Sequence, residues 1–257
     1  MSYLLLTCFF CVAVIHSVAG FGGGSSYLAL MALFGISTTI IPVIALACNI
    51  VVTACGTSNF VNARQMRWSL VWPYLIMSVP FSYLGGLTPV REEVYLLLLA
   101  GLLFLSSLRI VFANERNSLR ESKRLPPARI AAIIGALLGY LSGVVGIGGG
   151  VFLSPILLTR RWGNPKQVAA TCSLFILLNS AAGLLGQLQK LQLASNLLAS
   201  VAPFALLLPA VFVGGFLGSY LSASKFSQRA VANIIALLLF LVSIRLTATE
   251  FIHVRLW

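Results

Sequence analysis

Charged side chains are scarce in this sequence of 257 residues. Only 9% of the residues are Asp, Glu, Lys or Arg, five of these are acidic, and none of the four types occurs before Arg64. An uncharged stretch of that length exceeds the roughly 20 apolar residues that one membrane-spanning helix requires. A soluble domain of this size needs far more polar surface, so the composition indicates a membrane protein.

The apolar stretches also lack the alternation of polar and apolar residues that a transmembrane β-barrel requires. Lipid offers the backbone no hydrogen-bond partners, so a chain crosses a bilayer only as helices or as a closed barrel. Runs such as residues 95–99 are continuously apolar and rich in leucine, which predicts helices. The fold class expected from the sequence is therefore an all-α polytopic membrane protein.

Residues with metal-site spacing are missing as well. The five cysteines lie in apolar segments without a suitably spaced His, Asp or Glu, so we interpret them as small buried side chains. The sequence predicts neither a metal site nor a cofactor. The net charge of +12 does not indicate a nucleic-acid partner, because the basic residues lie in short loops between apolar segments. We expect this charge to face the anionic cytoplasmic leaflet of the bilayer.

An internal repeat organises the chain. Residues 19–24 and 145–150 both end in three consecutive glycines and lie 126 residues apart. Further landmarks recur in the same order at offsets of 129 or 130 residues: Pro80 and Pro209, Gly85-Gly86 and Gly214-Gly215, and Asn49 and Asn179. Several landmarks in one order indicate a duplication. The sequence predicts an N-terminal repeat over residues 1–118 and a C-terminal repeat over residues 119–257.

Each repeat is predicted to contain five apolar segments. In the first they cover residues 3–19, 24–35, 39–57, 69–88 and 93–112; in the second they cover 129–146, 150–159, 165–187, 194–222 and 228–247. The second segment of each repeat is short for a full span. We therefore expect a glycine-broken first helix in each repeat, with eight full spans or ten helical segments in all. A polar, basic linker, residues 113–128, joins the repeats.

The distribution of Lys and Arg predicts which way the segments run. If each glycine cluster only kinks one long helix, the basic residues divide 11 to 6 between the two faces. If the chain reverses at each cluster, 13 of the 17 share one face, and the other holds Arg91, Lys190, Arg245 and Arg255. The sequence favours the reversal, which inverts the repeats relative to each other and places both termini outside. No basic leader region precedes the first apolar segment, so we expect a retained helix rather than a signal peptide.

The two glycine clusters are candidate binding turns. Glycine adopts positive φ without strain, but each glycine costs about 1 kcal/mol relative to alanine inside a helix. Irregular backbone at membrane depth persists only where protein buries it or where it lines a wet cavity. A helix that restarts at Gly24 or Gly150 presents N–H groups and the positive end of its dipole, which suits an anion. The alternative is tight helix packing through small residues, and the duplication at a chain reversal favours a site.

The predicted membrane segments contain no acidic residue and no central Lys or Arg, which disfavours a cation pathway. Neutral groups would then bind the substrate: Gly22, Gly23, Gly24, Ser25, Asn49, Gly148, Gly149, Gly150, Thr171, Ser173 and Asn179, with Ser26 as a further donor. Each side chain alone could equally form a hydrogen bond between helices. His16 is the candidate for coupling to a proton, the alternative being a neutral packed histidine. Its repeat-mate is Ser142.

These motifs resemble the TauE/SafE sulfite exporter family over nearly the whole chain. The resemblance rests on the duplicated glycine turns, the basic loop between the halves, the Asn164-Pro165 pair and the two Pro-x-x-x-x-Gly-Gly elements. It implies a multi-pass secondary transporter of the bacterial inner membrane, an exporter of a small anion such as sulfite or an organosulfur anion. The two half-sites differ, because Ser25-Ser26 in the first half stands where the second has Val151-Phe152.

Other functions stay open at this point. A channel or permease for another small solute or a metal ion is the nearest alternative, but it needs a continuous polar path and the core has few polar residues. An intramembrane hydrolase is more distant, and its candidate dyad is His16 with Ser25 or Ser26. A membrane scaffold is disfavoured because the polar loops are short. We expect a protein that is not an enzyme, with a small anion and the lipid bilayer as partners, and we leave a homo-oligomer open.

Overall fold

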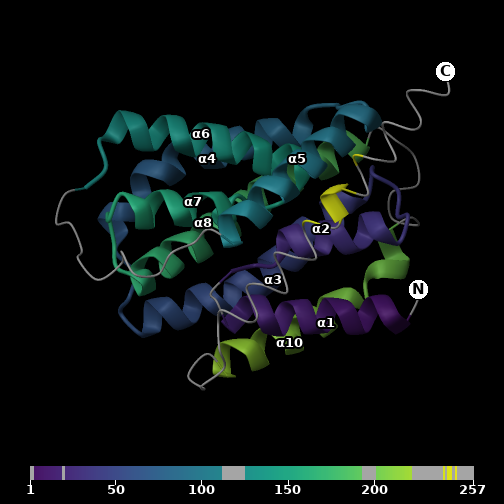
Figure 1. Ribbon diagram of the computed structural model, residues 1–257, viewed down its shortest axis with the longest axis horizontal. Coiled ribbons are helices and arrows are strands. Elements are labelled where there is room, and N and C mark those ends of the chain that lie inside the picture. The colour runs from purple at the N-terminus through teal and green to yellow at the C-terminus, as the bar shows by residue number, and fades with distance from the viewer. Residues whose placement is uncertain are drawn as a thin grey trace.

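The computed structural model describes residues 3–18, 21–111, 125–192 and 201–221, together with positions 240, 242–244 and 247. Every regular element in these ranges is a helix (Figure 1). The N-terminal half contains α1 (Tyr3–Val18), α2 (Gly24–Leu33), α3 (Ile41–Asn62), α4 (Trp68–Leu87) and α5 (Glu92–Val111). The C-terminal half contains α6 (Ala128–Val145), α7 (Gly150–Thr159), α8 (Pro165–Gln192), the 3-10 turn η2 (Ala202–Phe204) and α10 (Leu207–Leu221).

The predicted segments agree with the described helices, with one difference in the first half, where α3 ends at Asn62 rather than at residue 57, and two in the second half. Helix α8 continues past the predicted end at residue 187, because Gln187 is buried and its Nε2 donates a 2.8 Å hydrogen bond to Gly143 O. The segment 194–222 is not one helix. It contains η2 before α10 begins, and Pro203, which lacks an N–H donor, lies in that turn. The segment 228–247 and the linker 113–128 lie mostly outside the described residues.

The helices differ in their ability to cross a bilayer. Among the described residues, α3, α4, α6 and α8 are long and apolar enough to span one. Helices α2 and α7 have 10 residues each, which makes them about 15 Å long, half the thickness of the hydrocarbon core. The outer faces of α4 and α6 expose large apolar side chains such as Ile76 and Ile133, which suits contact with lipid.

The chain reverses at each glycine cluster. In the first half, Phe9 of α1 stacks on Tyr27 of α2 at 4.7 Å, so α2 folds back beside α1. In the second half, Leu157 near the end of α7 belongs to the same buried cluster as Ala131 near the start of α6. A Cβ atom at Gly149 would also lie 3.3 Å from Leu138 O of α6, so the second turn brings the chain back beside α6. The structure therefore agrees with the reversal that the Lys and Arg distribution favoured.

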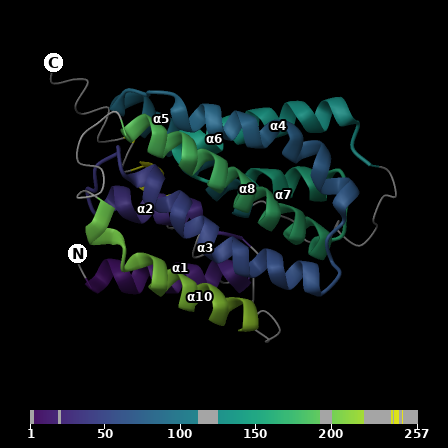
Figure 2. The same cartoon turned by 180° about the vertical axis from the view of Figure 1, so that it is seen from behind.

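Six of the described helices form an ordered series in which each packs on the next. The order is α6, α4, α8, α3, α10 and α1, as the two opposite views show (Figures 1 and 2). Helix α4 of the first half lies along α6 of the second, and α10 of the second half lies along α1 of the first. The centre of the series is the crossing of α3 and α8. Each half therefore buries its first helix against a helix of the other half.

Glycines allow the closest of these approaches. A Cβ atom at Gly135, Gly139 or Gly143 of α6 would overlap a backbone carbonyl oxygen of α4, which is Ser82 O in the case of Gly143. At the other end of the series, a Cβ at Gly218 of α10 would overlap Val14 O of α1. Helices in a bilayer associate through close backbone contact of this kind. Burial of apolar side chains does not drive their association, because the surrounding lipid is equally apolar.

We predict that Gly143→Ala destabilises the protein, because the added methyl group has to displace the backbone of α4. Overpacking of this kind typically costs 1–3 kcal/mol, and rigid backbone places this case at about the upper end. The matched control is Gly101→Ala in α5, where an added Cβ meets nothing within 4 Å. We expect Gly101→Ala to keep or raise the melting temperature in detergent and Gly143→Ala to lower it. Equal melting temperatures would show that α4 and α6 are not packed through this glycine.

Candidate functional site

The two helix restarts predicted from the glycine clusters are present. Helix α2 begins at Gly24 and α7 begins at Gly150, and in each case the preceding glycine is the left-handed N-cap. The φ angle is +81° at Gly23 and +76° at Gly149, a region that residues with a side chain rarely adopt. The clusters therefore form turns that require glycine, and each turn leads into the N-terminus of a short helix.

The two turns touch each other. A Cβ atom at Gly24 would lie 2.5 Å from Ile147 O in the other turn. Both turns also pack on the same two side chains at the crossing of α3 and α8. A Cβ at Gly22 would lie 2.8 Å from Asn49 Oδ1, and one at Gly148 would lie 2.8 Å from Ile176 Cγ2 and 3.0 Å from Asn49 Nδ2. The N-termini of α2 and α7 thus meet at one place in the core.

Asn49 is the polar side chain at this meeting point. It is completely buried, and its Nδ2 donates a long hydrogen bond of 3.4 Å to Ile147 O. Its Oδ1 has no hydrogen-bond partner among the described residues. A buried amide oxygen without a partner is costly, and a hydrogen-bond donor that binds at the turns would satisfy it. Asn49 is therefore both a link between the turns and an open hydrogen-bonding position.

Asn179 does not occupy the corresponding place in the second half, contrary to the match made from the sequence. Its Nδ2 donates to Phe175 O of its own helix at 2.8 Å. The side chain that packs on the second turn as Asn49 packs on the first is Ile176. Ser180, one residue beyond Asn179, approaches the turn instead, with its Oγ 3.4 Å from a Cβ position on Gly148. That hydroxyl is buried and has no partner among the described residues.

Two further predicted residues of α8 have other surroundings. Ser173 lies against α3, where its Oγ is 3.0 Å from Thr57 Oγ1 and donates to Thr53 O at 3.3 Å. Thr171 is fully buried, and its hydroxyl has no partner among the described residues. Ser173 therefore belongs to the packing of α3 on α8, while Thr171 keeps an unused hydroxyl in the core.

His16 and the serines after the first turn lie close together, as the candidate dyad required. His16 Nε2 is 2.9 Å from Ser26 Oγ, and both residues are buried. Ser25 is also buried, at the start of α2. The His16–Ser26 contact joins the end of α1 to the first turn of α2. The position corresponding to His16 in the second half holds Ser142, whose hydroxyl is buried and without a partner in the described part of the chain.

The surroundings of the turns are neutral. The buried polar residues among those described are Ser, Thr, Asn, Gln and His, and none of them is Asp, Glu, Lys or Arg. The described residues also contain no group of three or more His, Cys, Asp or Glu that could hold a metal ion. The described side chains around the turns therefore offer neutral hydrogen-bonding groups and the imidazole of His16. The sequence reasoning did not single out Ile176, Ser180, Thr53 or Thr57, since their roles depend on which faces of α3 and α8 cross.

Comparison with known proteins bears on this arrangement. The family model "Sulfite exporter TauE/SafE" matches residues 5–246. The chain is 36% identical, over 94% of its length and 96% of the other, to "Probable membrane transporter protein y4hK" of Sinorhizobium fredii. It is 28% identical, over 72% of each chain, to "Probable membrane transporter protein MJ0441" of Methanocaldococcus jannaschii. No solved structure matches. Two glycine turns meeting in an apolar helical core thus occur in a chain that belongs to the TauE/SafE sulfite exporter family and is a membrane transporter.

Proposed function

We propose that this protein is a secondary transporter of the bacterial inner membrane that exports a small anion, with sulfite or an organosulfur anion as the substrate. The observation that carries the proposal is the contact between the two glycine turns around Asn49. The family name supports a sulfur oxyanion, and the names of both relatives support transport.

The chemistry of the turns suits an anion better than a cation. The first N–H groups of α2 and α7 have no partner inside their helices, and both helix dipoles direct their positive ends to the same place. Helix N-termini bind phosphate, sulfate and carboxylate groups for this reason. The hydroxyls of Ser142 and Ser180 are buried and lack partners among the described residues, so they are available as donors. A cation would instead need carboxylates, and the described buried residues include none.

The proposal includes two inverted repeats, residues 1–118 and 119–257. The reciprocal packing of α4 on α6 and of α10 on α1 supports it. So do the ends of α2 and α7, which have the same backbone hydrogen bonds at an offset of 126 residues. Ile36 N donates to Met31 O as Trp162 N donates to Leu157 O, and the positive φ of Gly35 recurs at Arg161. Inverted repeats with short half-helices at the binding site are a recurrent transporter plan.

We expect sulfite or thiosulfate, but not Ni²⁺, to move through purified protein in proteoliposomes. The panel would compare sulfite, thiosulfate, sulfoacetate, sulfate, acetate, chloride and Ni²⁺, because only differential binding identifies the substrate. Gly149→Leu should lower the flux at least tenfold, and Asn49→Leu likewise, because each removes a group from the meeting point of the turns. A saturable flux separates a carrier from a channel.

Gly35→Leu is the matched control for Gly149→Leu. Gly35 also has positive φ, +67°, but an added Cβ there meets nothing within 4 Å. It therefore reproduces the backbone strain without touching the turns. If Gly35→Leu and Gly149→Leu lose flux equally, backbone strain rather than the site explains the loss. If both transport at the wild-type rate, the turns are packing elements and the proposed site is wrong.

We expect both termini to lie outside the cytoplasm. The described basic residues at the end of the molecule formed by the α3–α4 and α7–α8 loops include Arg64, Arg67, Arg160, Arg161 and Lys166, and this end should face the cytoplasm. A C-terminal alkaline phosphatase fusion should be active, since that enzyme folds outside, and a fluorescent protein in the linker 113–128 should fluoresce. The reverse pattern would overturn the proposed orientation.

His16 is proposed to carry a coupled proton, and its contact with Ser26 allows a sharp test. His16→Ala should abolish accumulation driven by a pH gradient while anion exchange between the two sides continues. Ser26→Ala removes the same hydrogen bond but keeps the imidazole, so it should keep both activities. Accumulation by His16→Ala at the wild-type level would exclude His16 as the proton carrier. Ester hydrolysis that needs both residues would support the intramembrane hydrolase instead.

A further inference from the structure

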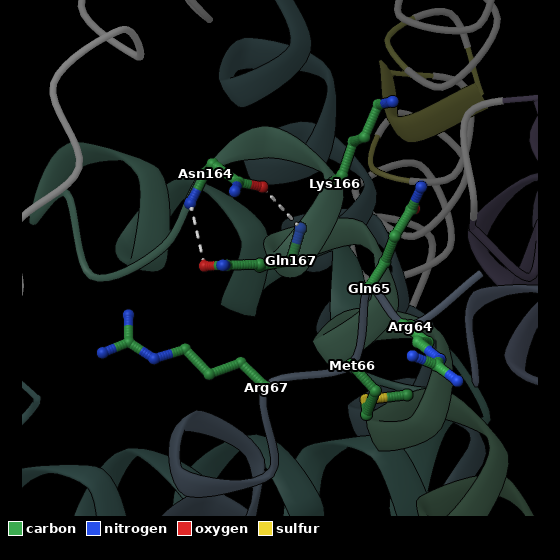
Figure 3. A pocket seen from close by; sticks show the side chains of 7 residues that line it. All are labelled: Arg64, Gln65, Met66, Arg67, Asn164, Lys166 and Gln167. Atoms are coloured by element: carbon green, nitrogen blue, oxygen red, sulfur yellow. Dashed lines mark hydrogen bonds between the residues drawn. The ribbon is translucent and has the colours of Figure 1, made fainter. Parts of the chain in front are cut away.

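A basic cavity lies at one end of the molecule, away from the glycine turns. Its volume is about 420 Å³, and it is lined by the α3–α4 loop of the first half and by the start of α8 in the second half. Three lining residues are basic, namely Arg64, Arg67 and Lys166. The others are Gln65, Asn164, Gln167 and a methionine, so no acidic side chain lines the cavity (Figure 3). A cavity with this lining favours an anion.

The walls of the cavity are held by hydrogen bonds. Asn164 Oδ1 accepts a 2.9 Å hydrogen bond from Gln167 N, and Gln167 Oε1 accepts one of 3.3 Å from Asn164 N, which forms a reciprocal cap at the start of α8 (Figure 3). Arg67 Nη1 donates to Trp162 O at 3.2 Å, which ties the loops of the two halves together. Arg64 and Lys166 are exposed at the rim. The cavity therefore spans the boundary between the halves.

A buried polar seam on α3 and α8 lies between the turns and the end of the bundle that holds the cavity. Along α3, Asn49, Thr53 and Thr57 recur every four residues, so they share one face of the helix. Thr53 Oγ1 donates to Asn49 O at 2.6 Å, and Thr57 Oγ1 lies 3.0 Å from Ser173 Oγ of α8. Gln167 of the cavity wall lies further toward the start of α8. Hydroxyl groups thus line the helix interface between the cavity and Asn49.

The equivalent of this seam on the other side of the turns has a different set of side chains. A Cβ at Gly56 of α3 would lie 3.1 Å from Ser173 Oγ, and a Cβ at Gly183 of α8 would lie 3.0 Å from Ser82 Oγ of α4 and 3.5 Å from Leu46 Cδ1 of α3. The Gly56–Ser173 and Gly183–Leu46 contacts are equivalent in the repeat, because residue 56 corresponds to 183 and residue 46 to 173 at the same offset of 127 residues. Under this offset Asn49 corresponds to Ile176. Thr57 corresponds to Leu184 and Ser173 to Leu46, whereas Thr53 corresponds to Ser180. Three of the four polar seam residues therefore have apolar equivalents, so repeated packing alone does not explain them.

We propose that the basic cavity is the vestibule where the anion enters and that the Thr57–Thr53–Asn49 seam is its route to the glycine turns. The inference rests on the proposed transport function and adds a side of entry to it. The basic cavity concentrates the anion at the end proposed to be cytoplasmic, which agrees with export. The far end of the bundle carries charges of both signs, namely Glu92 and Glu93 of α5 together with Arg91 and Lys190.

The test uses the double variant Arg64→Glu and Lys166→Glu in phosphatidylcholine proteoliposomes loaded at low protein density. The vesicles are separated by orientation through capture of a C-terminal tag, and the initial uptake of radiolabelled sulfite is measured in both fractions. Reversal of two vestibule charges should raise KM about tenfold or more with kcat little changed, because charged clefts change capture rates by factors of 10 to 1,000. The increase should appear in one orientation only.

The matched control is Arg129→Glu with Arg160→Glu, two exposed basic residues of the same end that do not line the cavity. An equal rise in KM for this control would show that general surface charge explains the effect, and the vestibule proposal would be wrong. A rise that appears only when phosphatidylglycerol is added would assign the cavity to a lipid headgroup and also overturn it. If the double variant transports sulfite with an unchanged KM, the vestibule proposal alone is wrong. If the wild-type protein transports no sulfite, both the proposed substrate and the vestibule proposal are wrong.

Discussion

The structure depends on the burial of two backbone turns that a bilayer cannot tolerate. Residues around Gly22 and Gly148 leave the helical hydrogen-bond pattern inside an apolar protein, and lipid offers such groups no partners. Only protein can cover them, and the covering surface is the crossing of α3 and α8. Because the turns touch one another, a single crossing serves both. The glycine contacts of α6 on α4 and of α10 on α1 then bring the remaining helices close enough to enclose this centre.

Much of the fold could be predicted, because the bilayer constrains the amino-acid composition and the length of the segments that cross it. Apolar length gave the helices, and glycine clusters next to short segments marked the reversals. The first half and α6 and α7 end within a few residues of their predicted bounds, with α3 extending furthest beyond them. Helix restarts at Gly24 and Gly150 followed from the cost of glycine inside a helix. The predicted segment 194–222 is not one helix for a different reason. This apolar run contains a proline in η2, and its missing N–H interrupts the helix.

The candidate site was less predictable, because its side chains depend on which faces of two helices cross. Asn49 and Asn179 match in residue type and order, so sequence comparison pairs them at an offset of 130. Packing pairs Asn49 with Ile176 instead, three residues away, which on a helix is nearly one full turn. The backbone of a repeat and its chemistry can therefore follow different registers. A duplicated residue type near a duplicated turn predicts a site only when the register of the packed helices is known.

That difference concentrates the side-chain chemistry in one half. The first half supplies the His16–Ser26 pair and Asn49, whereas the second supplies Ile176 and Phe152 at the corresponding places and retains Ser142 and Ser180 as donors. The helix dipoles remain balanced, because α2 and α7 both begin at the centre. An anion there would be attracted equally by the two halves but oriented mainly by one. Movement of the halves relative to each other would break the long Asn49–Ile147 hydrogen bond, because Asn49 lies on α3 and Ile147 in the second turn.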